Sequence, residues 1–418
     1  MRRAVILAPY WVSEKYVGNK RLNYFLEWLV EAGYEVVLVS SCANNLITKD
    51  IVTEEICVKD PFKIYSRDDR KRKKSKLRSI IFFVVKKLVY KILVPDPLIL
   101  WSYRVVNCEL VRSKVQGASL VLSSSPPESV HCAAIRLGRM YKVPVYVDMR
   151  DGWLDEPLKK PLKGAGFQRW REGRIEKKIL LSSRNIFVTS DGWKKVLAER
   201  IPEVGEKIVT LLTPARERQK HNLAERDVGL DTGRNLKLCY AGRFTGSSSS
   251  RKASLLFDRL YNGLKSSGAY GEIDIIGDLE ACDIREIKDF AERYSKSGWN
   301  IRLLNSVLPG SLSGILEDMD GFLMLSTSRY AIPSKFGTYL SVGRPILVFT
   351  YGDSEIWDLY NNIRGVYTVD IDAEGTMENI NSISEFVEGC KQKLCPCCLP
   401  EEFTEEHAKK TFFRQLTG

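Results

Sequence analysis

Cations and small residues follow one strand-like stretch in the second half of the chain. The apolar run Leu236–Gly242 is followed directly by Arg243, and Arg251 and Lys252 come after a serine-rich turn. Glycine lets a backbone approach a phosphate closely, and arginine or lysine balances the phosphate charge. The stretch therefore predicts a diphosphate-binding loop around Gly242. The alternative is a flexible, solvated loop, which serine runs commonly form.

A further cation lies at the start of a predicted helix, which Pro333 opens and Gly343 ends. The polar residues of its first turns are Ser334, Lys335 and Thr338. A helix N-terminus favours an anion, because its first N–H groups have no partner within the helix. A diphosphate could bind there. The alternative is an ordinary strand-helix-strand unit with the usual caps.

The first half carries a cluster of charged residues, Asp148, Arg150 and Asp151, just past a predicted strand. Two carboxylates beside an arginine could orient sugar hydroxyls or exchange protons with a substrate. We take the three residues as catalytic candidates. The alternative is a structural pair between Asp148 and Arg150, with Asp151 exposed to solvent.

Histidines and cysteines are the other residue types that could do chemistry. His131 lies early in a predicted helix, where it is either a site residue or a packed helix residue. Cys390, Cys395, Cys397 and Cys398 fall within nine residues, but they lack the paired C-x2-C spacing of zinc sites. The sequence therefore favours a loop with surface thiols and predicts no metal site.

The elements that must position these residues alternate between strands and helices. Arg3–Pro9 is a continuous apolar run, typical of a parallel strand buried on both faces. The amphipathic helix Asn19–Ala32 and the strand Glu35–Ser41 complete a β-α-β unit. Later elements are the strands Ala118–Ser124, Val143–Asp148 and Ile186–Ser190 and the helix Ser129–Tyr141.

The pattern restarts after a charged, non-periodic stretch over 214–234, which we interpret as a linker. The strands predicted beyond it are Leu236–Gly242, Ile273–Gly277, Ile301–Leu304, Gly321–Ser326, Pro345–Thr350 and Val366–Val369. Two Rossmann-like domains are therefore expected, over 1–213 and 235–395. A tail helix within 396–418 is expected to cross back to the first domain. In such sheets, ligands bind at the carboxyl ends of the strands.

Much of the positive charge lies in one segment. The 418 residues carry a formal net charge of +12, and Arg67–Lys91 alone contributes +9. Basic residues come first in the segment 67–94 and an apolar, lysine-containing stretch follows, as in a helix that lies on an anionic membrane. The alternative is a solvated loop leading into a half-buried helix. A nucleic acid partner is disfavoured, because the apolar side chains would add nothing to phosphate binding.

The N-terminus and the cysteines indicate the cellular compartment of the protein. The first apolar run is too short for a secretory signal, and lysines interrupt Ser79–Leu100, so no spanning helix is predicted. Most cysteines stand singly in apolar segments, for example Cys108, Cys132 and Cys239, as buried free thiols do in a reducing compartment. We expect a cytoplasmic protein, with a peripheral contact to the inner membrane face if 67–94 binds lipid.

Taken in order, these motifs resemble the retaining GT-B glycosyltransferases of family 4, in particular the bacterial polysaccharide branch. The resemblance covers nearly the whole chain. It rests on Glu31–Val36, Ser125-Pro126-Pro127, Asp148-x-Arg150-Asp151-x-Trp153, Tyr240-x-Gly242-Arg243, and Pro333-x-Lys335 through Gly343-Arg344-Pro345. The implied fold class is α/β of the GT-B type, with two Rossmann-like, doubly wound domains facing a cleft.

The resemblance also implies a reaction. The second half would bind a nucleotide diphosphate sugar as co-substrate, with Arg243 and either Arg251 or Lys252 on the diphosphate. No metal or other cofactor is expected, because protein cations would neutralise the leaving group. The sugar would pass with retention of configuration to a lipid-linked or polysaccharide acceptor. Candidate acceptor-side residues of the first half are Gly18, Arg21 and His131, near Asp151.

The chain departs from the family at two positions near the last motif. The family usually has glutamates there, and this chain has Tyr330 and Thr338. A neutral hydroxyl is a weaker acceptor for a ribose than a carboxylate is, and Glu355 is the residue that could substitute. Two alternatives to an active transferase therefore stay open. One is a catalytically silent GT-B scaffold or sugar-nucleotide-binding protein, and the other is a sugar-nucleotide epimerase.

Overall fold

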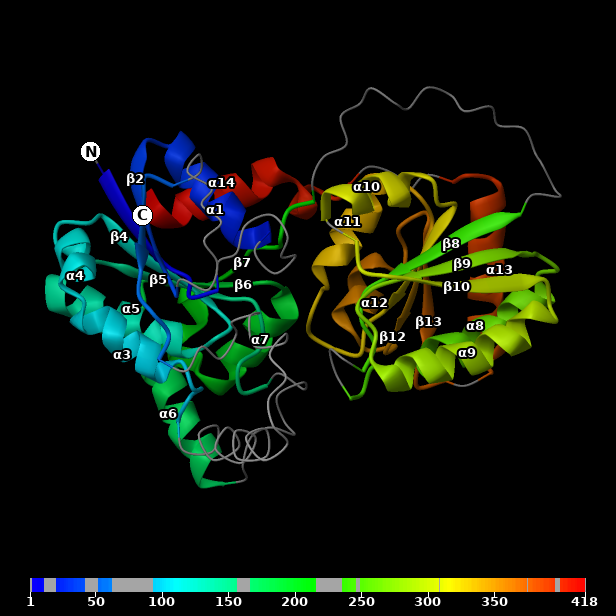
Figure 1. Cartoon of the computed structure of the whole chain (residues 1–418), viewed down its shortest axis with the longest axis horizontal. Coiled ribbons are helices and arrows are strands. Elements are labelled where there is room, and N and C mark those ends of the chain that lie inside the picture. The colour runs from blue at the N-terminus through cyan, green and yellow to red at the C-terminus, as the bar shows by residue number, and fades with distance from the viewer. Residues whose placement is uncertain are drawn as a thin grey trace, which may run out of the picture. The chain divides into compact units, whose positions relative to one another are not determined.

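The computed structural model describes residues 2–10, 20–41, 52–61, 93–155, 166–215, 235–245, 249–307, 309–373, 375–394 and 399–417. The chain divides into two compact units (Figure 1). Unit 1 comprises Met1–Leu211 and Gln415–Gly418, and unit 2 comprises Leu212–Arg414. Several predictions fall outside the described residues: Gly18, the thiols Cys395–Cys398, nearly all of the basic-apolar segment 67–94, and most of the linker 214–234.

Unit 1 is built on a seven-stranded sheet with the order β3-β2-β1-β4-β5-β6-β7 and parallel pairings throughout. The inner strands are almost wholly buried, because helices cover both faces of such a sheet. The strands are β1 (Arg2–Leu7), β2 (Tyr34–Ser40), β3 (Glu54–Cys57), β4 (Leu120–Ser125), β5 (Val145–Met149), β6 (Asn185–Val188) and β7 (Ile208–Thr210). The α-helices are α1 (Lys20–Glu31), α3 (Ile99–Asn107), α4 (Glu109–Val115), α5 (Ser129–Tyr141), α6 (Phe167–Ser182) and α7 (Asp191–Arg200).

Unit 2 repeats this plan with a six-stranded parallel sheet of order β10-β9-β8-β11-β12-β13. Its strands are β8 (Leu236–Ala241), β9 (Gly271–Ile276), β10 (Trp299–Leu304), β11 (Gly321–Leu325), β12 (Ile346–Thr350) and β13 (Val366–Asp370). Its helices are α8 (Ser254–Ser266), α9 (Ala281–Ser295), α10 (Pro309–Glu317), α11 (Ser334–Val342), α12 (Glu355–Tyr360) and α13 (Met377–Lys391). Helix α14 (Glu405–Thr417) ends the chain, and its last residues group with unit 1.

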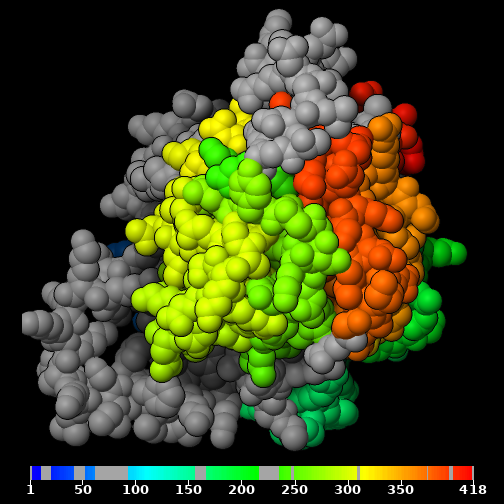
Figure 2. All heavy atoms as spheres, turned by 90° about the vertical axis from the view of Figure 1, so that its right-hand side faces the viewer, coloured from blue at the N-terminus to red at the C-terminus, as the bar shows by residue number. Residues whose placement is uncertain are grey.

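Two apolar cores sandwich the sheet of unit 2. One core takes Phe257 from α8, Ile287 from α9 and Phe386 from α13. The other takes Phe336 from α11 and Ile356 from α12. Figure 2 shows the first of these helix layers from outside, with α8 between α9 and α13. The sheet is therefore covered on both faces, and only its strand ends are open to a ligand.

The predicted α/β fold class of two doubly wound units is confirmed. Every predicted strand is present within a few residues of its expected bounds. Cys108, Cys132 and Cys239 are free thiols, as expected, but Cys57 is disulfide-bonded, which departs from the predicted pattern of free thiols. Among the described residues, no helix is long and apolar enough to cross a membrane.

Candidate functional site

Each sheet reverses its direction of winding at one point. In unit 2 the chain proceeds from β8 outward to β9 and β10, and then from β11 outward to β12 and β13. In unit 1 the corresponding neighbours are β1 and β4. Ligands of doubly wound sheets bind at the carboxyl ends of the strands that flank such a switch point. The residues that follow these four strands are therefore the candidate sites.

Lys335 lies at the switch point of unit 2, in the first turn of α11. Its Nζ donates to the Ala241 carbonyl at 3.1 Å and lies 4.6 Å from the centre of the Tyr240 ring. Burial, helped by the positive charge of Arg251, lowers the pKa of Lys335 to about 7. A cation that the protein itself stabilises so poorly would gain from an anion placed beside it. The predicted role of Lys335 in phosphate binding thus fits its surroundings.

Gly242, which follows β8, leaves the space that Lys335 uses. Its φ is +150°, and a Cβ at this position would lie 2.8 Å from Lys335 Nζ. The backbone after β9 approaches just as closely, because a Cβ on Gly277 would lie 2.1 Å from the Gly242 carbonyl oxygen. Both positions thus require glycine, and together they keep the backbone beside Lys335 free of side chains.

Replacing Gly242 by alanine is expected to destabilise unit 2 by about 1–3 kcal/mol, the usual cost of a strained backbone conformation. The new Cβ should also push Lys335 Nζ away from the Ala241 carbonyl. Thermal unfolding with and without a nucleoside diphosphate measures both effects. Gly268→Ala is the matched control, because Gly268 also has a positive φ, +63°, but a Cβ added there would meet no atom within 4 Å. Equal losses of the response to nucleotide in both variants would contradict the assignment.

The other predicted cations lie nearby with different exposures. Arg243 donates to Asp278 at 3.3 Å, and both side chains are largely exposed. Arg251 is half-buried and close enough to lower the pKa of Lys335, whereas Lys252 is exposed. The arrangement favours Lys335 and Arg251 as the inner cations of an anion site, with Arg243 and Lys252 at its rim.

Neutral side chains occupy the positions where the resembled family has glutamates. Tyr330 is 37% exposed, and its amide N–H donates to Ser328 Oγ at 3.3 Å. Thr338 is half-buried, and its Oγ1 donates to the carbonyl of Ser334 at 3.5 Å. Ser334 itself is exposed at the start of α11. Neither replacement supplies a charge.

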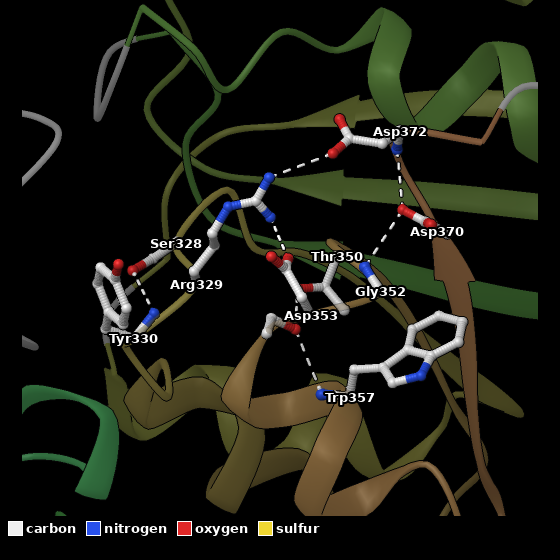
Figure 3. A network of polar contacts seen from close by, with 10 residues as sticks. Ser328, Arg329, Tyr330, Thr350, Gly352, Asp353, Trp357, Asp370 and Asp372 are labelled. Atoms are coloured by element: carbon white, nitrogen blue, oxygen red, sulfur yellow. Dashed lines mark hydrogen bonds and ion pairs between the residues drawn. The ribbon is translucent and has the colours of Figure 1, made fainter. Parts of the chain in front are cut away.

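An ion-pair network that no sequence motif predicted joins the loops after β11, β12 and β13 (Figure 3). Arg329 pairs with Asp353 and, at 3.3 Å, with Asp372, and its guanidinium lies 4.0 Å from the centre of the Tyr351 ring. The amide N–H of Glu355 donates to the Arg329 carbonyl at 2.9 Å. Glu355 thus starts α12 against the loop that carries Tyr330, which keeps it a candidate for the missing carboxylate.

Asp148, near the end of β5, is fully buried, and both of its oxygens have partners. Oδ1 accepts from Arg21 Nε at 2.7 Å, and Oδ2 accepts from Ser124 Oγ at 2.7 Å. Arg21, on α1, is only 3% exposed. A carboxylate held in this way orients its neighbours and is poorly placed to exchange a proton with a ligand. We therefore assign Asp148 and Arg21 a positioning role in place of the expected catalytic and acceptor-binding roles.

Asp151 and Arg150 follow in the loop after β5. Arg150 Nε donates to the Ser125 carbonyl at 2.7 Å, which ties this loop to the one after β4. Asp151 is half-buried rather than exposed, and within the described residues it has no hydrogen-bond or ion-pair partner. Burial raises the pKa of Asp151, against the opposing charge of Arg150. An unengaged carboxyl group with a raised pKa is suited to acid-base chemistry.

His131, in the first turn of α5, is completely buried. Its Nδ1 lies 2.8 Å from Ser123 Oγ, and its ring centre lies 6.1 Å from that of Trp153. Burial lowers the pKa of His131 to about 3, so the ring is neutral at neutral pH. These contacts support the packed-residue interpretation of His131 rather than the acceptor-side one.

A pH titration of stability is expected to reveal His131. The unfolded chain binds a proton near the ordinary histidine pKa of about 6.5, whereas the folded protein does not until about pH 3. The unfolded state therefore takes up more protons in this window, and stability falls as the pH falls. Between pH 6.5 and 4.5 the wild type should lose about 2.3 kcal/mol more than His131→Gln, measured by urea denaturation. Parallel losses in both proteins would contradict a neutral, buried His131.

Among the residues that the structure describes, no group of three or more His, Cys, Asp or Glu side chains is placed to hold a metal ion.

No protein-family model matches the sequence. No curated protein matches it as a relative either.

Solved structures, in contrast, match the chain over nearly its whole length. The Anabaena protein HepE in complex with UDP and glucose superposes with a TM-score of 0.63 at 9% identity, covering 100% of both chains. A glycosyltransferase from Rickettsia africae gives a TM-score of 0.60 at 11% identity, covering 100% of this chain and 98% of that one. S. aureus TarM in complex with UDP, α-GlcNAc-glycerol and fondaparinux gives 0.61 at 11% identity, with both chains fully covered. At such identities the likeness is one of fold, and the fold is that of GT-B glycosyltransferase structures.

Proposed function

We propose that this chain is a glycosyltransferase that takes a sugar from a UDP-sugar and passes it to a glycan or lipid-linked acceptor. The observation that carries the proposal is the grouping of Lys335, Arg251 and Gly242 at the switch point of unit 2. HepE and TarM, which have the same fold, were both solved with UDP. The choice of UDP rests on these two proteins.

The donor diphosphate would lie against Lys335 and the N-terminus of α11. Lys335 and Arg251 would stabilise the negative charge that develops on the leaving diphosphate, with Arg243 and Lys252 as outer cations. Since these cations take the part that a divalent ion would otherwise play, we expect transfer without a metal. Activity that a chelator abolishes and Mg²⁺ or Mn²⁺ restores would contradict this part of the proposal.

The chemical step would form a bond between C1 of the sugar and an acceptor hydroxyl oxygen while the bond from C1 to the diphosphate breaks. The hydroxyl proton would pass to the Asp151 carboxylate or to the leaving diphosphate. Asp148, held by Arg21, would keep the loop of Asp151 in place. We propose retention of the anomeric configuration, which the anomeric proton coupling of the product measures directly.

Asp151→Asn is expected to lower kcat by about 10²–10⁴-fold, the rate factor that a positioned acid or base usually contributes. The free energy of unfolding should change little, because the described structure gives this carboxyl group no partner to lose. Steady-state kinetics with saturating donor measure the loss, and the UDP-induced thermal shift is the control for intact donor binding. A variant with wild-type kcat would remove Asp151 from the mechanism.

One observation favours a second function, a catalytically silent protein that binds sugar nucleotides. Tyr330 and Thr338 supply no carboxylate where the resembled family has two. Glu355 would compensate only if its side chain reached the ribose. Loss of donor affinity in Glu355→Gln, with no change in Thr338→Ala, would support that compensation.

The test of the proposed function is incubation with UDP-glucose, UDP-galactose and UDP-N-acetylglucosamine, followed by quantification of every nucleotide product. Release of UDP with or without added acceptor supports a transferase. Binding without turnover supports the silent protein, and conversion of one UDP-sugar into another supports an epimerase. The lipid-linked nature of the acceptor and a peripheral location at the inner membrane face belong to the same proposal and rest on the sequence of 67–94.

A further inference from the structure

The first turns of helix α6 bury charged side chains and expose aromatic ones, the reverse of an ordinary surface helix, whereas its last turns bury Ile179 and Leu180. Glu172 and Glu176 face the interior of unit 1, where Glu172 accepts from Trp153 Nε1 at 2.9 Å and Glu176 pairs with Arg200. The large aromatic residues of the helix face solvent. Phe167 is 68% exposed and Trp170 is 54% exposed. Two large rings this exposed, side by side on one helix, mark an interaction surface.

The two rings form one unit with the arginines of the same turns. Phe167 and Trp170 stack with their centres 5.7 Å apart. Arg171 lies 5.9 Å from the Phe167 centre, and Arg174 lies 5.0 Å from the Trp170 centre. We call Phe167, Trp170, Arg171 and Arg174 the aromatic-arginine face of α6.

The charge of this face is purely positive. Arg171 and Arg174 are exposed, and neither has a carboxylate partner within the described residues. The acidic residues of the same turns, Glu172 and Glu176, are buried and already engaged. An anionic partner would therefore meet uncompensated positive charge around an apolar centre.

The ring arrangement favours a membrane surface over a glycan or a nucleic acid. A pyranose or a nucleobase binds by stacking on an open ring face. Here each ring already has an aromatic neighbour and a guanidinium neighbour, while more than half of each residue remains exposed. Aromatic side chains flanked by arginines are the residues that settle at the boundary between lipid headgroups and acyl chains.

We propose that the aromatic-arginine face of α6 docks on an anionic lipid bilayer, with Phe167 and Trp170 inserted at the headgroup level and Arg171 and Arg174 on lipid phosphates and carboxylates. This contact uses residues other than those of the predicted membrane segment 67–94. It does not depend on the proposed glycosyl transfer, because no residue of this face lies at either switch point.

Cosedimentation of the full chain with phosphatidylserine-containing vesicles tests the proposal. Phe167→Ala with Trp170→Ala should weaken binding at least about tenfold. Arg171→Gln and Arg174→Gln together should weaken it by about 25-fold at low salt, at roughly fivefold for each arginine. Tyr270→Ala, which removes a 45%-exposed ring from unit 2, is the matched control and should bind as the wild type does. Each comparison is repeated in a background without 67–78, so that the basic segment cannot hide the effect.

Brominated lipids provide the second measurement. They should quench the wild type more than Trp170→Phe, although both should bind the vesicles. Unchanged vesicle binding by the Phe167→Ala, Trp170→Ala variant in the background without 67–78 would overturn the proposal. A wild type that binds a glycan or single-stranded DNA but not vesicles would also overturn it, if this variant loses that binding. All variants should keep the UDP-induced thermal shift. If they do, either of these results counts against the membrane contact and leaves the proposed function intact.

Discussion

Asp148→Ala is expected to lower the free energy of unfolding of unit 1 by about 3–5 kcal/mol. The substitution leaves the Arg21 guanidinium buried at 3% exposure without its carboxylate. It also removes the acceptor of Ser124 Oγ. Removing one member of a buried ion pair costs far more than the pair is worth, because the remaining charge stays desolvated. Urea denaturation of the wild type and the variant measures the loss.

A surface pair of the same chemistry provides the control. Arg293 and Asp258 lie 3.2 Å apart, but both side chains are about half exposed, at 44% and 53%. Asp258→Ala should therefore cost under about 1 kcal/mol. Arg21→Met combined with Asp148→Leu should recover much of the loss, because no unpaired charge remains. Similar costs for Asp148→Ala and Asp258→Ala would contradict the positioning role of the buried pair.

Donor affinity is expected to fall steeply as the pH rises above 7. The pKa of Lys335 in the free protein is about 7, and a bound diphosphate would raise it because the charged form gains a partner. Binding above pH 7 must therefore take up a proton, whereas below pH 7 the lysine is already charged. Each pH unit above 7 should weaken binding roughly tenfold until the pKa of the complex is reached. Calorimetric titration with a UDP-sugar between pH 6 and 9 measures this slope.

A UDP-sugar is the right ligand for this experiment because its diphosphate is esterified at both ends and lacks the phosphate ionisation near pH 6. Lys335→Arg should bind with a flat pH profile, since arginine stays charged throughout. Lys335→Met should also give a flat profile, with affinity lower by about 10–150-fold at pH 6.5, the worth of a charged hydrogen bond. A wild-type profile as flat as that of Lys335→Arg would show that Lys335 does not meet the diphosphate.

The sequence predicted the strands well because burial on both faces makes them recognisable one at a time. Ala4–Leu7 of β1 and Phe322–Leu325 of β11 are unbroken apolar runs with no exposed surface. The edge strand β3, Glu54–Cys57, has only four residues, of which Ile56 alone is buried, and it was missed. The strand β7, with three residues, was missed for the same reason.

The partners of the site residues could not be predicted, because the sheets bring together side chains that are far apart in the chain. Asp148 was taken as a catalytic candidate, with a pair to Arg150, two residues away, as the alternative, but Arg21 holds it from 127 positions away. Lys335 was placed correctly at a helix start, yet nothing in its surroundings in sequence predicted Tyr240 beneath it. The sequence of α6 also did not predict which of its residues are buried, because its buried glutamates and exposed rings reverse the usual periodicity.

The central claim is that a nucleoside diphosphate binds beside Lys335 and Arg251 in unit 2, and thermal unfolding with UDP tests it most directly. UDP at about a hundred times its dissociation constant should stabilise the wild type by about 2.7 kcal/mol. The account predicts that this shift disappears in Lys335→Met with Arg251→Gln and persists in the surface control Arg293→Gln. No shift in the wild type with UDP or any UDP-sugar, or the same shift in the double variant as in the wild type, would contradict it.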